Sequence, residues 1–130
     1  MFLGHGYIQV KDGMRIIADL DLIRYYHRLI DYYNYRTEKL QLPAHGAHIT
    51  IVNPKIHRGV LFNSALQYHG KRVTFNYFPE KAYISNVNYW IPVTCKFADE
   101  LKNKLGVDDG KNYWGLHLTI CNKKFDRNEN

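Results

Sequence analysis

The chain has 130 residues and a formal net charge of +6, with charged residues of both signs spread along it. The length is that of one ordinary domain and no linker-like segment interrupts it, so we expect a single domain over residues 1–130. The positive charge favours an anionic ligand such as a phosphate ester or nucleic acid. The sequence lacks a block of five or six consecutive Lys or Arg residues, which argues against a dedicated duplex-DNA binder.

Cysteine and hydropathy patterns limit the compartment and the metal chemistry. Cys95 and Cys121 form no CxxC or CxxCH spacing, so we expect them to be small buried apolar residues rather than metal ligands. No apolar run approaches 18 residues, and the N-terminal stretch lacks the pattern of a signal peptide. We therefore expect a cytoplasmic protein with no membrane segment.

The first half of the chain predicts a hairpin and then a helix. Residues 7–10 and 14–18 alternate like strands and are joined by an Asp-Gly turn signal. Asp19 and Asp21 are N-cap candidates for an amphipathic helix of about four turns that extends to Tyr33, with His27 on its solvated face. Residues 36–46 are expected to form a loop before a strand that begins at His48.

The second half repeats this order of elements. The expected strands are residues 73–78, 83–84 and 89–94, and Pro92 indicates an edge strand or a bulge. A helix with Phe97, Leu101 and Leu105 on one face follows and ends at Gly106. Residues 114–121 form the last predicted strand, and residues 123–130 a frayed polar tail. The sequence of residues 55–70 is ambiguous and favours neither a helix nor a strand.

A histidine motif occurs once in each half. His48-Ile49-Thr50 opens one predicted strand, and His117-Leu118-Thr119 lies in the last one. In a strand, residues i and i+2 point to the same side, so each motif places an imidazole beside a hydroxyl with an apolar side chain opposite. Two such motifs arise by chance with a probability of roughly a few per cent. The repeat therefore favours a functional pair over two unrelated core histidines.

Two imidazoles that share a cleft can work as a base and an acid. Histidine titrates near neutral pH, so a neutral ring can remove a proton from a hydroxyl nucleophile while a protonated ring donates to the leaving oxygen. The threonine hydroxyls can donate hydrogen bonds to the non-bridging phosphate oxygens, whose charge grows in the transition state. This chemistry uses no metal, and neither motif contains the carboxylates of a two-metal nuclease.

The paired His-x-Thr motifs resemble the signature motifs of the two-histidine (2H) phosphoesterase superfamily. The segments 17–30, 47–52 and 112–120 are similar to its bacteriophage branch, which includes the anti-CBASS nucleases that degrade cyclic di- and oligonucleotide signals of bacterial immunity. The resemblance covers the chain from about Gly6 to Cys121. It implies a bilobal α+β fold in which two antiparallel sheets form a central cleft, with helices outside and pseudo-twofold symmetry. The lobes would span roughly residues 1–60 and 61–122.

The resemblance also implies an activity. The protein would be a metal-independent, cofactor-free phosphodiesterase that acts on cyclic oligonucleotides in a bacterial host cytoplasm, where it would serve phage evasion of immunity. His48 and His117 would be the acid–base pair, and Thr50 and Thr119 would orient the phosphate; which histidine is the base stays open. Related phage enzymes use a longer tail at the nucleotide site, whereas 11 residues follow Thr119 here.

Four further residues are candidate substrate contacts. Tyr7 and Tyr113 could stack on a base, and Lys55 and Lys123 follow the two motifs at similar offsets, where they could meet phosphate. For the tyrosines the alternative is a place in the sheet, and for the lysines it is a solvated surface position.

Two other functions remain open from the residues alone. The same chemistry would serve RNA ends with 2′,3′-cyclic phosphates or 2′–5′ linkages, and only a panel of substrates separates these from cyclic oligonucleotides. A non-enzymatic nucleotide sponge would bind a nucleotide at saturable sites and release no product.

Overall fold

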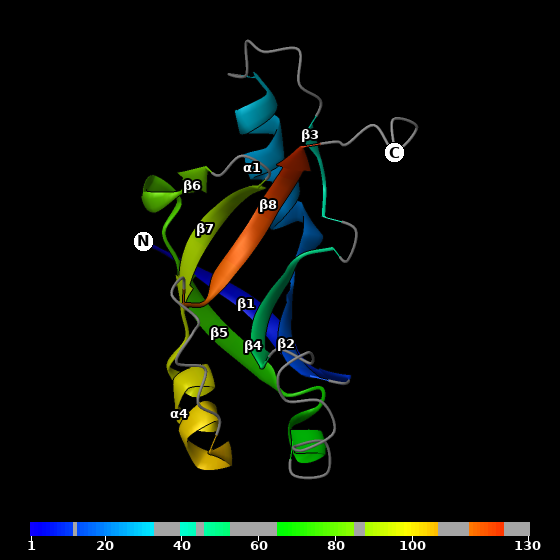
Figure 1. Cartoon of the computed structure of the whole chain (residues 1–130), viewed down its shortest axis with the longest axis vertical. Coiled ribbons are helices and arrows are strands. Elements are labelled where there is room, and N and C mark those ends of the chain that lie inside the picture. The colour runs from blue at the N-terminus through cyan, green and yellow to red at the C-terminus, as the bar shows by residue number, and fades with distance from the viewer. Residues whose placement is uncertain are drawn as a thin grey trace.

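The computed structural model describes residues 1–11, 13–32, 40–43, 46–52, 65–84, 88–106 and 115–123. Within these ranges, two helices, α1 (Leu20–Tyr32) and α4 (Lys96–Leu105), and two single turns of 3₁₀-helix, η1 (Leu66–Tyr68) and η2 (Pro79–Lys81), accompany an antiparallel sheet (Figure 1). The strands are β1 (Phe2–Lys11), β2 (Gly13–Ala18), β3 (Leu40–Gln41), β4 (His48–Val52), β5 (Arg72–Tyr77), β6 (Tyr83–Ile84), β7 (Asn88–Thr94) and β8 (His117–Lys123).

The strands form one sheet in the order β3-β8-β7-β5-β1-β2-β4, and β6 pairs with β7. The α+β class is confirmed, but the expectation of two separate sheets is wrong. The reason is the central ladder: β1 and β5 pair from Phe2↔Tyr77 to Tyr7↔Arg72, which joins the strands of both halves without a break. The sheet curls into a half-barrel, so that β4 and β8 contact each other although they lie far apart in the pairing order (Figure 1).

Strand alternation separates an apolar face of the sheet from a polar one. Ile8, Ile16, Ile49 and Leu118 are each fully buried and belong to one core, which also includes Ile23 of α1 and Ala98 and Leu101 of α4. Burying one such aliphatic side chain stabilises the fold by about 1.5–3 kcal/mol. This core fixes the register of each strand, since a slip of one residue would turn its buried set toward solvent.

Glycines in β1 let its neighbours approach closely. The ring of Phe75 lies over Gly4, where a Cβ atom would be 2.4 Å from the ring edge. At Gly6, a Cβ atom would lie 2.4 Å from the backbone oxygen of Ile17 and 2.7 Å from Cγ2 of Ile16. The central strand therefore needs glycine at these positions for steric reasons.

We expect Gly6→Ala to destabilise the protein. The added methyl group meets backbone rather than a flexible side-chain end, so strand β2 must shift, and overpacking of this kind costs about 1–3 kcal/mol. Urea unfolding followed by circular dichroism measures the change in free energy. Thr74→Ala, at an exposed position of neighbouring β5, is the control. A Gly6→Ala protein as stable as the wild type would contradict the tight packing.

Helix α1 begins where the sequence predicts. The Oδ1 atom of Asp19 accepts a hydrogen bond from the backbone N–H of Asp21 at 3.0 Å, so Asp19 is the N-cap. Burial, reinforced by neighbouring Tyr77, raises the pKa of Tyr26 to about 12. His27 was expected on a solvated face, but it is half-buried and its Nε2 lies 3.0 Å from the carbonyl oxygen of Leu40. The prediction failed because Leu40 and Gln41, placed in a loop by the sequence, pair with β8 as strand β3 and pack beside α1.

Pro92 was expected in an edge strand or at a bulge, and it is in neither. Strand β7 lies between β5 and β8, and its bulge falls at Tyr89/Trp90. Because Val93 donates its N–H toward β8, Pro92 faces the β5 side, where β5 has already ended at Tyr77. The missing N–H of proline therefore leaves no ladder bond unmade.

For the remaining predicted elements, the comparison concerns the residues at which each begins or ends. Helix α4 ends as expected, at Gly106 with φ of 68°. Strand β8 begins at His117, after Gly115 and Leu116, which were also expected in it, whereas residue 114 lies outside the described part of the chain. Lys123, expected in the tail, ends that strand. Residues 124–130 lie outside the described part of the chain.

Both cysteines are buried as expected, and burial raises the pKa of the Cys95 thiol. No helix in the described ranges is long and apolar enough to cross a membrane.

Candidate active site

The two motif strands have the same register with their neighbours. In the first half, His48 pairs with Ile17 of β2 and Thr50 with Arg15. In the second half, the equivalent pairs join His117 to Pro92 of β7 and Thr119 to Trp90.

A register shift follows each motif at the same point. It lies between Met14 and Arg15 in β2 and between Tyr89 and Trp90 in β7. Such bulges bend a strand and re-aim its side chains. The two halves thus share the local geometry of the motif strand as well as the order of their elements.

A glycine two residues before each histidine completes the repeat. Gly46 and Gly115 have φ angles of 73° and 62°, in the left-handed region that favours glycine. The carbonyl oxygen of Gly46 lies 3.1 Å from Nδ1 of His48, and that of Gly115 lies 3.2 Å from Nδ1 of His117. The repeated unit is therefore Gly-x-His-x-Thr, and its glycine carbonyl fixes the histidine ring.

The residue between glycine and histidine anchors each turn to the sheet. Ala47 and Leu116 are buried. Their carbonyl oxygens accept hydrogen bonds from the backbone N–H groups of Ala18, at 2.9 Å, and Val93, at 3.0 Å. These hydrogen bonds tie the start of β4 to β2 and the start of β8 to β7.

These contacts set the tautomer of both rings. A carbonyl oxygen can only accept, so Nδ1 of each histidine carries the hydrogen that it donates to the glycine. Nε2 is then the atom that holds the lone pair in the neutral ring and the second proton in the charged ring. Each ring thus presents Nε2 for proton exchange, as an acid–base residue requires.

All four motif side chains lie on one face of the sheet. Residues paired across an antiparallel ladder share a face, and the pairing runs without interruption from β4 to β8. His48, Thr50, His117 and Thr119 are half-buried, whereas the intervening Ile49 and Leu118 are fully buried on the other face. Because β4 contacts β8, the curl of the sheet brings the two motif strands side by side.

The structure describes two of the four residues that the sequence predicts as further substrate contacts. Tyr7 lies in β1, is 44% exposed and pairs with Ile17 of β2, which in turn pairs with His48. Lys123 is the last residue of β8. Lys55 and Tyr113 lie outside the described residues. The roles assigned to these four residues stay predictions.

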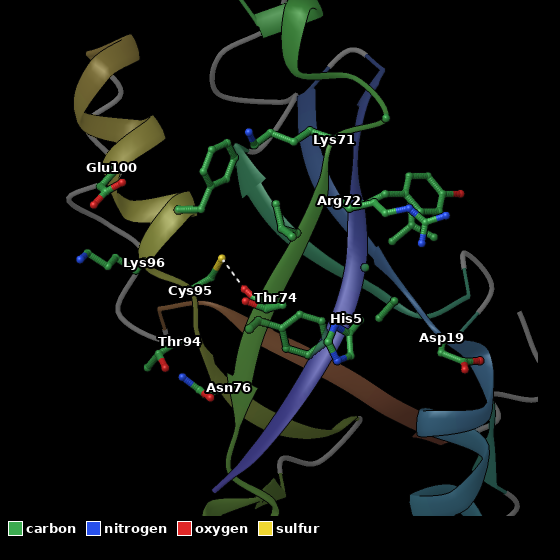
Figure 2. A pocket seen from close by; sticks show the side chains of 18 residues that line it. His5, Asp19, Lys71, Arg72, Thr74, Asn76, Thr94, Cys95, Lys96 and Glu100 are labelled. Carbon is green, nitrogen blue, oxygen red and sulfur yellow. Dashed lines mark hydrogen bonds between the residues drawn. The ribbon is translucent and has the colours of Figure 1, made fainter.

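A large open pocket lies over β1 and β5, between the starts of α1 and α4 (Figure 2). Its volume is about 1070 Å³, and Tyr7 lines it together with His5, Lys71, Arg72 and Lys96. Figure 2 looks at this pocket across β1 and β5, with β4 and β8 behind them. The described lining contains no residue of β4 or β8, but it includes Ile17, the cross-strand partner of His48, so the pocket adjoins the first motif.

Sequence reasoning missed two residues beside the motifs. Trp90 packs against His117 with ring centroids 5.2 Å apart, and Arg15 is the cross-strand neighbour of Thr50. Only the pairing between strands places these two residues beside the motifs, and no local pattern in the sequence indicates them. For Gly46 and Gly115 a signal was present, namely a glycine at the same offset before each histidine.

Among the described residues, no group of three or more His, Cys, Asp or Glu side chains could hold a metal ion.

We expect Gly46→Ala and Gly115→Ala to reduce the activity of the site. An alanine Cβ would meet nothing within 4 Å at either position, so the effect is conformational: the left-handed geometry costs an L-residue about 1–2 kcal/mol. Relief of that strain moves the carbonyl that fixes the histidine. Steady-state turnover and thermal unfolding measure the two effects.

Gly106→Ala is the matched control for these variants. Gly106 has φ of 68° and equally open surroundings, but it ends α4 away from the motifs. It should lose similar stability and keep its turnover. Equal turnover in all three variants would show that the glycine carbonyls do not position the histidines.

Comparison of the chain with protein-family models, curated proteins and solved structures gave no match.

Proposed function

We propose that this protein is a metal-independent phosphodiesterase of the two-histidine type that cleaves cyclic di- or oligonucleotides. The observation that carries the proposal is the repeated Gly-x-His-x-Thr unit, which has the same register, the same bulge and the same Nδ1–carbonyl contact in both halves. Two core histidines that served packing alone would have no reason to share all three features.

The proposed reaction uses a nucleophile within the substrate. One histidine takes the proton of a ribose 2′-hydroxyl through Nε2, and the hydroxyl oxygen forms a bond to the adjacent 3′-phosphorus. The bond from phosphorus to the 5′-oxygen breaks, and the second histidine gives its Nε2 proton to that oxygen. The products are a 2′,3′-cyclic phosphate and a free 5′-hydroxyl, and the two histidines have exchanged protonation states.

The threonines contribute electrostatic stabilisation in this scheme. Thr50 and Thr119 lie on the same face as the histidines, each two residues further along its strand. Their hydroxyl groups can donate hydrogen bonds to the two non-bridging phosphate oxygens, which gain charge as the fifth bond to phosphorus forms. The stiff χ1 of a threonine in a strand helps to keep such a donor preorganised.

The net charge of +6 supports an anionic substrate, and the resemblance of the sequence to phage anti-CBASS nucleases favours cyclic nucleotides among such substrates. Cleavage of an immune signal in a host cytoplasm is the corresponding biological role.

The test is a cleavage assay in the presence of EDTA. Purified protein is incubated with 3′,3′-cyclic dinucleotides, a cyclic trinucleotide, 2′,3′-cyclic mononucleotides and 2′–5′ oligoadenylate, and the products are identified by mass spectrometry. Turnover of the cyclic di- or trinucleotides supports the proposal. Turnover of only the last two substrates would replace it by a role at RNA ends. Saturable binding without any product would replace it by a nucleotide sponge.

A further inference from the structure

The two halves of the candidate site are alike in backbone but differ in chemistry. On β2, the residue paired with Thr50 is Arg15; on β7, the residue paired with Thr119 is Trp90. Cross-strand partners on one face have Cβ atoms about 5 Å apart, so each of these side chains adjoins a motif threonine. One end of the site therefore carries a guanidinium group, and the other carries an indole.

The aromatic end is extended by a third strand. Tyr83 of β6 pairs with Trp90, and their rings lie 4.9 Å apart with an angle of 31° between the planes. Trp90 also contacts the ring of His117, with 5.2 Å between the ring centroids. Tyr83 is 43% exposed, so the row of rings that starts at His117 reaches solvent. We name Trp90 and Tyr83 the aromatic platform.

The cationic end is held in place by one neighbour. The Nε atom of Arg15 donates a hydrogen bond of 2.6 Å to Oε1 of Gln9, and Arg15 is half-buried. Among the described residues, no carboxylate forms an ion pair with Arg15. A guanidinium group is planar, and the N–H groups of its terminal nitrogens match the oxygen atoms of a phosphate.

We propose that these residues orient the substrate across the site, with a nucleobase on the aromatic platform and a phosphate group on Arg15. Aromatic faces stack on any base, and such stacking tolerates differences in base identity. An Arg fork binds phosphate oxygens but cannot replace that stacking. The inference rests on the proposed function, because it assigns the direction in which a nucleotide lies over the two histidines.

The orientation also bears on the symmetry of the chemistry. Since the backbone of the motifs repeats, a substrate could lie over them in two opposite directions. The platform and Arg15 select one of these, so that a given histidine always faces the nucleophile and the other always faces the leaving oxygen.

The first test is a binding measurement that requires no turnover. The chain contains two tryptophans, so Trp114→Phe leaves Trp90 as the sole tryptophan fluorophore. In that background, adenosine 3′-monophosphate and uridine 3′-monophosphate should both quench the emission of Trp90. Inorganic phosphate should displace the nucleotide without comparable quenching of its own. Equal quenching by inorganic phosphate would overturn the assignment of the base to the platform.

Three variants separate the two ends. Tyr83→Ala removes a ring that is 43% exposed; it should weaken nucleotide binding at least 5-fold, the lower limit for one stacked base, and leave phosphate binding unchanged. Arg15→Gln should weaken both ligands about 10-fold. Arg24→Gln removes the same charge from a residue that pairs with Asp21 on α1, and it should change neither. Nucleotide binding that Tyr83→Ala leaves unchanged would refute the proposed orientation. Equal ligand affinities of the Arg15→Gln and Arg24→Gln variants would refute it as well.

Wild-type turnover measured in parallel distinguishes this inference from the proposed function. Turnover that persists while Tyr83→Ala and Arg15→Gln bind normally would reject the orientation and leave the enzyme assignment standing. Platform-dependent nucleotide binding without turnover of any substrate would reject the enzyme assignment and keep the platform as a nucleotide-binding feature.

Discussion

His48→Ala and His117→Ala should each reduce the turnover of a cyclic dinucleotide by about 10²- to 10⁴-fold, the range that a positioned general acid or base contributes. The reason is that each ring presents Nε2 for proton transfer while Nδ1 is engaged by the glycine carbonyl two residues earlier. The double variant should lose little more than either single variant, because the base and the acid act in the same step. Single-turnover kinetics with EDTA present measures the chemical step.

Two controls keep this result interpretable. His5→Ala removes an exposed histidine of β1 that belongs to neither motif, and it should retain wild-type turnover. His48→Asn and His117→Asn keep a polar, planar side chain but cannot act as an acid or a base near neutral pH. Either asparagine variant retaining more than a tenth of wild-type turnover would mean that its histidine serves packing or binding rather than catalysis.

Thr50→Val and Thr119→Val should each lower the turnover number by about 10²- to 10³-fold, the cost of removing one preorganised donor from a developing oxyanion. Valine has the shape of threonine and suits a strand, so the substitution removes the hydroxyl group with little change in packing. The loss should fall on the turnover number more than on the Michaelis constant, because the charge on the phosphate oxygens grows in the transition state.

Serine provides the matched rescue for the threonine variants. Thr50→Ser and Thr119→Ser keep the donor and lose only a methyl group, so they should recover most of the turnover that valine removes. Thermal unfolding of all four variants should stay close to that of the wild type, because both positions are only half-buried. Valine variants with normal turnover would show that the hydroxyl groups do not touch the reacting phosphate.

Part of the fold could be read directly from local patterns. The alternation around Ile8 and Ile16, the spacing of apolar residues after Asp19 and the glycine at position 106 each reflect a contact within a few residues. Local dihedral preferences and hydrophobic periodicity determine such features, and both are properties of the sequence itself. The half-barrel was not readable in this way, because it depends on the ladder between β1 and β5, whose partners are about 70 residues apart.

The predictions for His27 and Pro92 were also wrong because each depends on a segment far away in the chain. His27 was placed on a solvated face because its helix looks amphipathic, but a distant segment at Leu40 covers it. Pro92 predicts an edge strand or a bulge, because a proline has no N–H to donate to an interior ladder. Only the end of β5 at Tyr77 reveals that no donor is needed at that point.

The sequence by itself determined the candidate site, because two His-x-Thr motifs at matching places need only strand periodicity to put each imidazole beside a hydroxyl. Tertiary structure decided what surrounds them. The curl of the sheet brings β4 beside β8, and cross-strand register places Arg15 next to one threonine and Trp90 next to the other. Such neighbours are set by packing and hydrogen bonding between segments remote in the chain, which no local pattern encodes.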